Sequence, residues 1–349
     1  MKKLILLATL IALCAAPLKA QNVDQSAQIA QLTEEVNTLK TKSTTWDKIT
    51  KALPKISGYA QVRYEFKGGD ASTSTFQLRR VRVSFDGNIS PKIDYKLQAE
   101  LTSFKLVDAY FSYKPLDALN VRAGQFKLPF SIENTDYGPT KIELIDYPMA
   151  LTYLVAYDEA IGEDVIKANG RDLGAKIYGK FANGIVAYDL GVFNGRGLNT
   201  KDNNKSKDVV GRLNIRPIKG LLLSGSYMWG EYGSSYLKRE RWGAGVCYDY
   251  GNWMARSEYI GGNTGEQTSE GVYVTAGYRF CKNWMAVARY DTFCENTEFR
   301  PETSTTTYTV GINWRPVKHF LMQANYAYED MVSGQGSRNI FQLQVSAIF

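Results

Sequence analysis

The chain has 349 residues, with 42 lysines and arginines against 35 aspartates and glutamates, a formal net charge of +7. Its bases are scattered beside acids, whereas a nucleic-acid binder concentrates them in a patch or helix, so we expect no nucleic-acid partner. One histidine and four cysteines without metal-ligand spacing leave little for a catalytic pair. We therefore expect no enzyme activity, no metal site and no cofactor.

Residues 1–20 have the form of a secretory signal peptide. Two lysines precede an apolar run at residues 4–16, which is too short to span a bilayer. We place the cleavage after Ala20, which removes three lysines and leaves 39 bases (42 − 3) against 35 acids. Lipidation at Cys14 is the alternative, but Leu13 is larger than the residue usual before a lipidated cysteine. The mature chain is expected to be exported.

Residues 21–53 are predicted to hold a short coiled-coil helix. Ile29, Leu32, Val36 and Leu39 repeat at the three- and four-residue spacing of a heptad seam. A lone helix of this length is marginal in water, so it needs partners. We favour a trimeric coiled coil over a leader without fixed structure; a periplasmic spacer or tether is the alternative role.

From residue 54 to residue 349 the hydrophobic pattern has a period of two, the signature of β-strands. Residues 56–66 place one apolar and one polar face on the first strand, and residues 341–349 do the same at the end of the chain. A soluble sandwich alternates in the same way. Segments of about ten residues and aromatic residues near strand ends, such as Trp242 and Trp284, favour a membrane barrel.

The connections support a transmembrane antiparallel β-barrel of about 16 strands, an even number as bacterial barrels require. Tight turns rich in proline, glycine and asparagine alternate with longer polar loops, as in barrels of the Gram-negative outer membrane. We expect the longer loops at residues 194–207, 231–239, 261–270, 293–303 and 330–337.

One connection, residues 128–170, is much longer than the others. A loop of this size in a compact domain is usually functional, and a wide barrel offers space for it in the lumen. Its apolar part, residues 142–155, is predicted to form a short helix or folded piece on the inner wall. We expect the loop to constrict the pore; an external cap is the alternative.

If the apolar faces meet lipid, the polar faces line a water-filled lumen and carry slightly more bases than acids. Rings of arginine and lysine favour the passage of anions. The alternative is that bases and acids pair across neighbouring strands, so that the wall is hydrated but selects no ion. The candidate anion path comprises Arg63, Arg80, Arg82, Lys96, Arg122, Lys127, Arg212 and Arg279.

Three segments resemble a known family. These are Arg79 to Gly87 (RRVRVSFDG), Asp108 to Phe111 (DAYF) and Val121 to Ser131 (VRAGQFKLPFS). They resemble the phosphate-selective porins O and P, in a form found in Bacteroides-like bacteria, and the likeness covers residues 56–349. It implies a trimeric porin of sixteen strands with an inward third loop, which passes phosphate or polyphosphate.

The loop departs from the family's basic constriction. It has few bases, chiefly Lys141 and Lys167, beside eight acids, which predicts only a weak preference for anions. Our interpretation is an outer-membrane porin for passive diffusion of small solutes, chiefly anions such as phosphate or polyphosphate. We expect it to contact outer-membrane lipid and to assemble as a homotrimer. The alternative is a structural outer-membrane protein that tethers or assembles through its coiled coil and has a general pore.

Overall fold

The computed structural model describes residues 30–38, 40, 53–69, 72–331 and 336–349, and its contacts divide the chain into two units at residues 53 and 54. In the first unit a helix covers residues 30–38, and its Leu32 and Val36 are exposed. The predicted signal peptide and the seam residues Ile29 and Leu39 lie outside the described residues. None of the described helices is long and apolar enough to cross a membrane.

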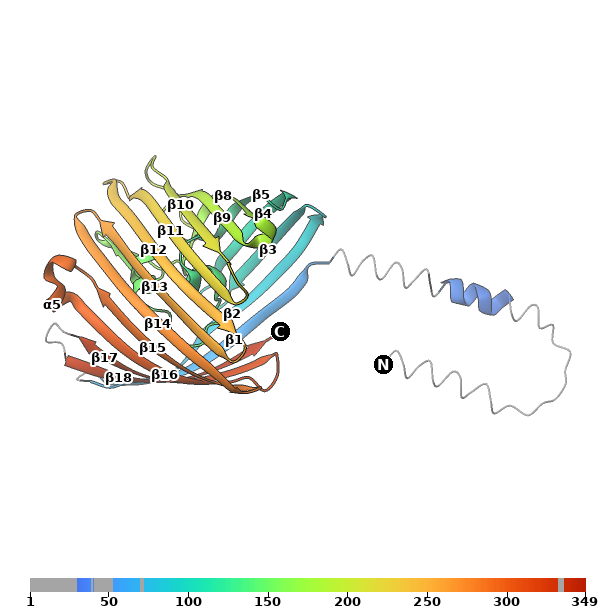
Figure 1. Cartoon of the computed structure of the whole chain (residues 1–349). Helices are drawn as coiled ribbons and strands as arrows, with labels where there is room; N and C mark the ends of the chain where they lie inside the picture. Colours follow the sequence, from blue (N-terminus) through green and yellow to red (C-terminus); the bar gives the residue numbers. More distant parts are fainter. Residues whose placement is uncertain (1–29, 39, 41–52, 70–71, 332–335) are drawn as a thin grey trace. The chain divides into compact units, whose positions relative to one another are not determined.

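The second unit is a closed barrel of sixteen antiparallel strands in which each strand pairs with its neighbour in the chain and β1 pairs with β18 (Figure 1). This confirms the predicted fold class. The strands are β1 (Lys55–Lys67), β2 (Thr73–Ser90), β3 (Ile93–Glu100), β4 (Lys105–Leu116), β5 (Leu119–Lys127), β8 (Arg171–Phe181), β9 (Val186–Phe193), β10 (Asp208–Ile215), β11 (Leu221–Tyr232), β12 (Leu237–Tyr250), β13 (Trp253–Thr264), β14 (Gln267–Cys281), β15 (Trp284–Cys294), β16 (Ser304–Trp314), β17 (Phe320–Met331) and β18 (Gly336–Ile348).

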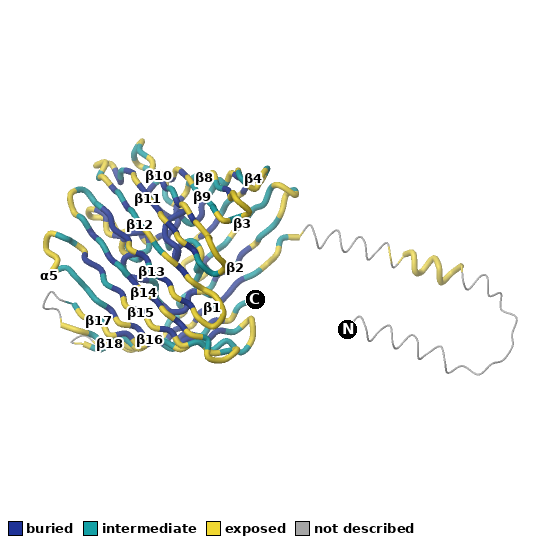
Figure 2. The backbone as a smooth tube through the Cα atoms, viewed as in Figure 1, coloured by how far each residue is buried: buried dark blue, intermediate teal, exposed yellow. Residues whose placement is uncertain are grey.

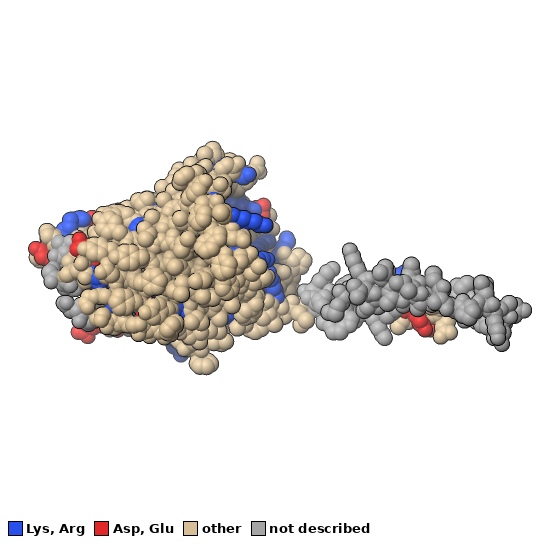
Figure 3. Space-filling view, turned by 90° about the horizontal axis from the view of Figure 1, so that it is seen from below, with Lys and Arg blue, Asp and Glu red and all other residues tan. Residues whose placement is uncertain are grey.

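The two faces of each strand have opposite polarity, and the polar face is the buried one. In β1, Gln61, Arg63 and Glu65 are buried, whereas Val62 and Phe66 are exposed, as the alternation predicted. Buried and exposed positions alternate along most strands (Figure 2). The face of the barrel seen in Figure 3 is mostly uncharged, and the charges visible on it are concentrated toward the two ends. Such a wall is apolar toward a bilayer and polar toward its lumen.

Within the described residues the connections differ from the prediction at two places, and the loop expected at residues 330–337 includes residues 332–335, which lie outside the described residues. The loops expected at residues 231–239 and 261–270 shrink to residues 233–236 and 265–266, because the antiparallel ladders continue beyond the apolar part of the strands. Polar residues at a strand end do not stop backbone pairing, so polarity alone overstated these loops. Residues 194–207 and 295–303 do form longer connections.

A β-bulge interrupts the pairing of β1 with β2. Gln61 faces Arg80 and Val62 faces Leu78, so Arg79 is the extra residue. An extra residue shifts the alternation by one position and re-aims a side chain. Arg79 and Arg80 therefore both line the interior, although they are adjacent in sequence.

The connection between β5 and β8 folds against the inner faces of the strands. It contains α3 (Ile132–Asp136), α4 (Met149–Leu154) and a hairpin of β6 (Glu159–Ile161) and β7 (Asp164–Ile166). The apolar side chains of α4 and its flanks pack on wall residues such as Val210, Met228 and Ile260, which are fully buried. Its polar groups bond to strands around the barrel, including β1, β10, β13, β15 and β18.

Candidate functional site: a charged lumen divided by an inner segment

The inner segment (residues 128–170) is held first by Arg256 and Glu258 of β13. The Arg256 guanidinium lies 2.8 Å from a carboxylate oxygen of Glu133 and 2.6 Å from one of Glu143, and all three side chains are nearly inaccessible. We call the buried ion pairs of Arg256 with Glu133 and Glu143 the first clasp. Glu258 accepts hydrogen bonds from the Ser131 hydroxyl at 2.8 Å and from the backbone N–H of Ile132 at 2.6 Å. A carboxylate at the first turn of α3 satisfies its free N–H groups and fixes the start of that helix.

A second clasp, also of buried ion pairs, holds the β6–β7 hairpin. Glu159 of β6 accepts from Arg241 at 2.7 Å and from both Nε (3.0 Å) and Nη2 of Arg239, while Arg239 also pairs with Asp208 at 2.8 Å. All four side chains are buried. Burial would raise the pKa of Glu159, but the two arginines outweigh it and hold that pKa below its ordinary value. The clasp therefore stays charged at neutral pH.

On the opposite side the segment contacts the strands where the barrel closes. Asp146 lies 2.9 Å from Arg63 of β1 and accepts a hydrogen bond from Gln342 of β18 at 2.5 Å. Its side chain is about half exposed, at 48%. Partial desolvation by the protein that surrounds it inside the barrel acts to raise the pKa of Asp146, yet the charge of Arg63 and the Gln342 bond lower that pKa below its ordinary range. Asp146 is therefore ionised at neutral pH.

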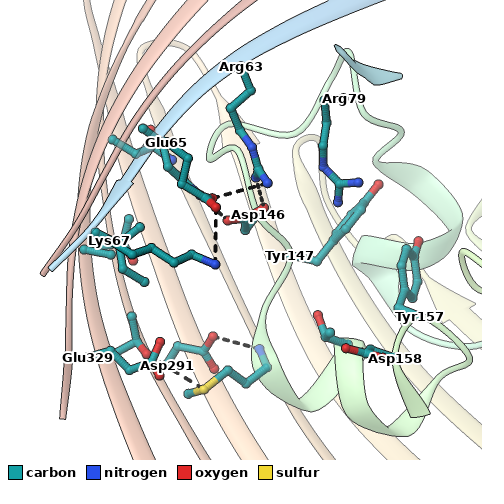
Figure 4. A pocket seen from close by; sticks show the side chains of 18 of the residues that line it. Arg63, Glu65, Lys67, Arg79, Asp146, Tyr147, Tyr157, Asp158, Asp291 and Glu329 are labelled. Carbon is teal, nitrogen blue, oxygen red and sulfur yellow. Dashed lines mark hydrogen bonds and ion pairs between the residues drawn. The ribbon is translucent and has the colours of Figure 1, made fainter. Parts of the chain in front are cut away.

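Between this contact and the strands lies a cavity of about 540 Å³ (Figure 4). It is bounded by β1, β2, the first residue of β4, β15, β16, β17, β18 and the inner segment. Eight basic side chains line it against five acidic ones. The bases are Arg63, Lys67, Arg79, Arg80, Lys105, Lys167, Arg289 and Arg338, and the acids are Glu65, Asp146, Asp158, Asp291 and Glu329.

Most of these charges are paired. Arg338 pairs with Glu329, Lys67 with Glu65, and Lys167 with Asp158, at 2.7 to 3.2 Å. Within the described residues, Arg79, Arg80 and Lys105 take part in no ion pair, and the buried Nε of Arg79 has no hydrogen-bond partner. The uncompensated positive charge is thus concentrated where the bulge brings Arg79 and Arg80 together.

The eight predicted site residues divide into two groups. Arg63 and Arg80 line the cavity, whereas the other six lie outside its lining. Those six have local partners elsewhere on the wall: Arg82 with Glu100 at 2.8 Å, Lys96 with Asp86 at 3.0 Å, Arg122 over the Tyr110 ring at 4.0 Å, Lys127 with the carbonyl of Asn134, Arg212 with Asp136 at 2.8 Å and Arg279 with Asp249 at 2.8 Å.

The sequence prediction missed Arg79, because strict alternation counted from Arg80 and Arg82 places it on the lipid face with Val81. Two adjacent arginines in a strand of otherwise alternating polarity are the signal for a bulge. It also missed Lys105 and Arg338, which lie at or near strand ends. Lys67 and Arg289 were expected on polar strand faces but were not included in the candidate anion path.

A family model described as phosphate-selective porin O and P matches residues 56–235, which is 180 of the 349 residues. The chain belongs to this porin family. The expected resemblance is confirmed, and with it the assignment to the outer membrane of a Gram-negative bacterium and to the channel-forming proteins. No curated protein gives a match.

Solved structures show that this porin shares its fold with distant channels. It is similar to an anion-selective porin from Comamonas acidovorans, with a TM-score of 0.67, 14% identity and coverage of 84% of this chain and 99% of that one. It is also similar to the trimer form of OmpT from Vibrio cholerae, with a TM-score of 0.62, 12% identity and coverage of 85% of this chain and 100% of that one. A third similar structure is Salmonella typhi OmpF in complex with daunomycin, with a TM-score of 0.62, 11% identity and coverage of 86% of this chain and 99% of that one. At these identities the likeness concerns the fold.

Proposed function

We propose that this porin passes small anions, such as phosphate or polyphosphate, by passive diffusion through the cavity beside β1, β2 and β15 to β18. The observation that carries the proposal is the excess of eight bases over five acids in the lining, with Arg79 and Arg80 unpaired. Fixed positive charge raises the local concentration of anions and lowers that of cations. No catalytic step is part of this function.

The path is set by the inner segment. The ion pairs at Arg256 and Glu159 fasten it to β12 and β13, and its apolar residues pack on the lumen side of β10, β11 and β13. Solutes then have the remaining space on the other side, where the segment presents Asp146, Tyr147 and Tyr157 (Figure 4). In this proposal residues 128–170 form the constriction.

The acidic character of the segment does not oppose anion passage. Seven of its acids are paired with bases: Glu133 and Glu143 with Arg256, Asp136 with Arg212, Asp146 with Arg63, Asp158 with Lys167, Glu159 with Arg239 and Arg241, and Asp164 with Arg196. These carboxylates serve as attachments to the wall. The charge that remains for solutes is that of the bases in no ion pair, among which Arg80, within the described residues, donates only to the neutral Gln61 at 3.2 Å.

We propose that the porin assembles as a homotrimer. The support is the trimer form of the Vibrio cholerae structure with the same fold, together with the predicted heptad seam before residue 54. Crosslinking of purified protein in detergent should give a limiting species of three chains; a limiting monomer would contradict the assignment.

The test is the zero-current potential in a planar bilayer under a potassium chloride gradient. We expect a potential of the sign of anion selectivity, and phosphate should reduce the chloride current. R79Q/R80Q loses two positive charges, each of which contributes about 0.5 kcal/mol to an ion roughly 8 Å away in water. Together they favour an anion and disfavour a cation by about 1 kcal/mol each, so the ratio of anion to cation permeability should fall about thirtyfold. The matched control is R279Q, which removes a paired arginine outside the cavity and should leave selectivity unchanged. Equal selectivity in R79Q/R80Q and the unmodified porin would refute the proposal.

A further inference from the structure

The cavity contains aromatic surface that the passage of inorganic anions does not require. Tyr147, Tyr153 and Tyr157, all from the inner segment, line it. The rings of Tyr147 and Tyr157 lie 4.8 Å apart at 49°, and Tyr153 lies 5.2 Å from Phe293 of β15.

The hydroxyls of the first pair are already bonded to the segment. The Tyr147 hydroxyl donates to the carbonyl oxygen of Tyr137 and the Tyr157 hydroxyl to the side-chain oxygen of Asn134, each at 3.0 Å. Hydrogen bonds at the far end of each ring fix its orientation, and both side chains remain partly exposed toward the cavity. The two residues therefore present rigid ring surface, whereas their polar ends are turned to the protein.

This ring surface adjoins the unpaired positive charge. In Figure 4 the guanidinium of Arg79 extends toward the ring of Tyr147, with Tyr157 beyond it. A solute that places an anionic group against Arg79 and Arg80 has its remaining atoms beside these rings. A cavity of about 540 Å³ is within the range that holds small organic ligands.

We propose that the cavity is a binding subsite for anions that carry a planar aromatic ring, such as aryl carboxylates. The carboxylate pairs with Arg79 and Arg80, and the ring contacts Tyr147 and Tyr157. The proposal rests on the anion-channel function above, and it specifies a solute class that charge alone does not select. A ring–ring contact of this kind strengthens binding about fivefold for each tyrosine, so an aryl carboxylate should bind at least tenfold more tightly than an aliphatic one.

The test compares block of the chloride current at pH 7 by benzoate, cyclohexanecarboxylate and acetate. The three carry the same charge, and the first two are similar in size. We expect benzoate to block at a concentration at least tenfold lower than cyclohexanecarboxylate, and acetate to block only at a higher concentration than either. Equal block by benzoate and cyclohexanecarboxylate would overturn the aromatic subsite. This comparison uses the unmodified porin, so its outcome does not depend on whether a variant folds.

Two variants locate the effect. Y147L/Y157L removes both rings and should reduce the preference for benzoate over cyclohexanecarboxylate to about twofold, while phosphate block stays unchanged. Y147F/Y157F keeps the rings without the hydroxyls and should retain the preference. Identical behaviour of the two variants would refute the role of the rings. If the unmodified porin shows no preference for chloride over potassium, the underlying channel proposal is refuted instead. The failure of the aromatic subsite and the failure of the anion channel are therefore distinguishable.

Discussion

Replacing Arg256 by methionine should release the inner segment from β13. The substitution leaves Glu133 and Glu143, with side-chain exposures of 1% and 9%, buried without their shared countercharge. Removing one partner of a buried ion pair costs about 3 to 5 kcal/mol. Because about 1.4 kcal/mol is a factor of ten, the population of released segments should rise at least a hundredfold.

The assay is single-channel recording in a planar bilayer. A segment that leaves the wall opens the part of the lumen that it occupies, so R256M should show larger or fluctuating conductance. The unmodified porin should give one steady level. Far-UV circular dichroism checks that the barrel itself is intact.

Two further variants separate charge from shape. Combining R256M with E133Q and E143Q removes all three charges, and we expect steady conductance to return, because a neutral buried cluster has no uncompensated charge. R256K keeps the charge but loses the two-sided donor geometry of the guanidinium, and it should be intermediate. Steady, unchanged conductance in R256M would refute the view that this clasp holds the segment.

Three other outcomes are expected. The pKa of Asp146 is held below its ordinary value by Arg63, so the stabilising contact is complete above about pH 4 and is lost as the pH falls through the lowered pKa. Conductance of the unmodified porin should therefore change only in strong acid. D146N, which has no carboxylate, should show the altered conductance at neutral pH. E159Q should destabilise the folded barrel by about 3 kcal/mol in urea titrations, since it leaves two buried arginines without their shared carboxylate; an unchanged midpoint would contradict this. Gly124 has φ of 126° and an added Cβ would lie 2.2 Å from the carbonyl oxygen of Ala109, so G124A should reduce the yield of folded barrel, and a normal yield would show that β4 and β5 can separate.

The alternation of apolar and polar residues was enough to predict the barrel and its strand number, because lipid outside and water inside impose a period of two on every strand. Arg63 was assigned to the lumen on this basis, and it lies there. The same rule fails at Arg79, since a bulge depends on pairing with β1 and not on the composition of β2.

The division of the lumen was harder to predict. Val210, Met228 and Ile260 interrupt the polar face of their strands, and this is the sequence signal that an apolar element packs inside. Which charges stay unpaired depends on contacts between residues distant in the chain. Arg212, for example, meets Asp136 across 76 positions, and sequence spacing does not reveal that pairing.

The contacts of Asp146 have a consequence for the order in which the molecule is assembled. Asp146 joins Arg63, 83 positions away on the first strand, to Gln342, 196 positions away on the last. This three-way contact exists only when the first and last strands are side by side, so an incomplete sheet cannot form it. Contacts of such long sequence separation form late in folding. The segment can therefore dock at this seam only when the ring closes. Asp146 then stabilises the closed barrel through its contacts with both strands.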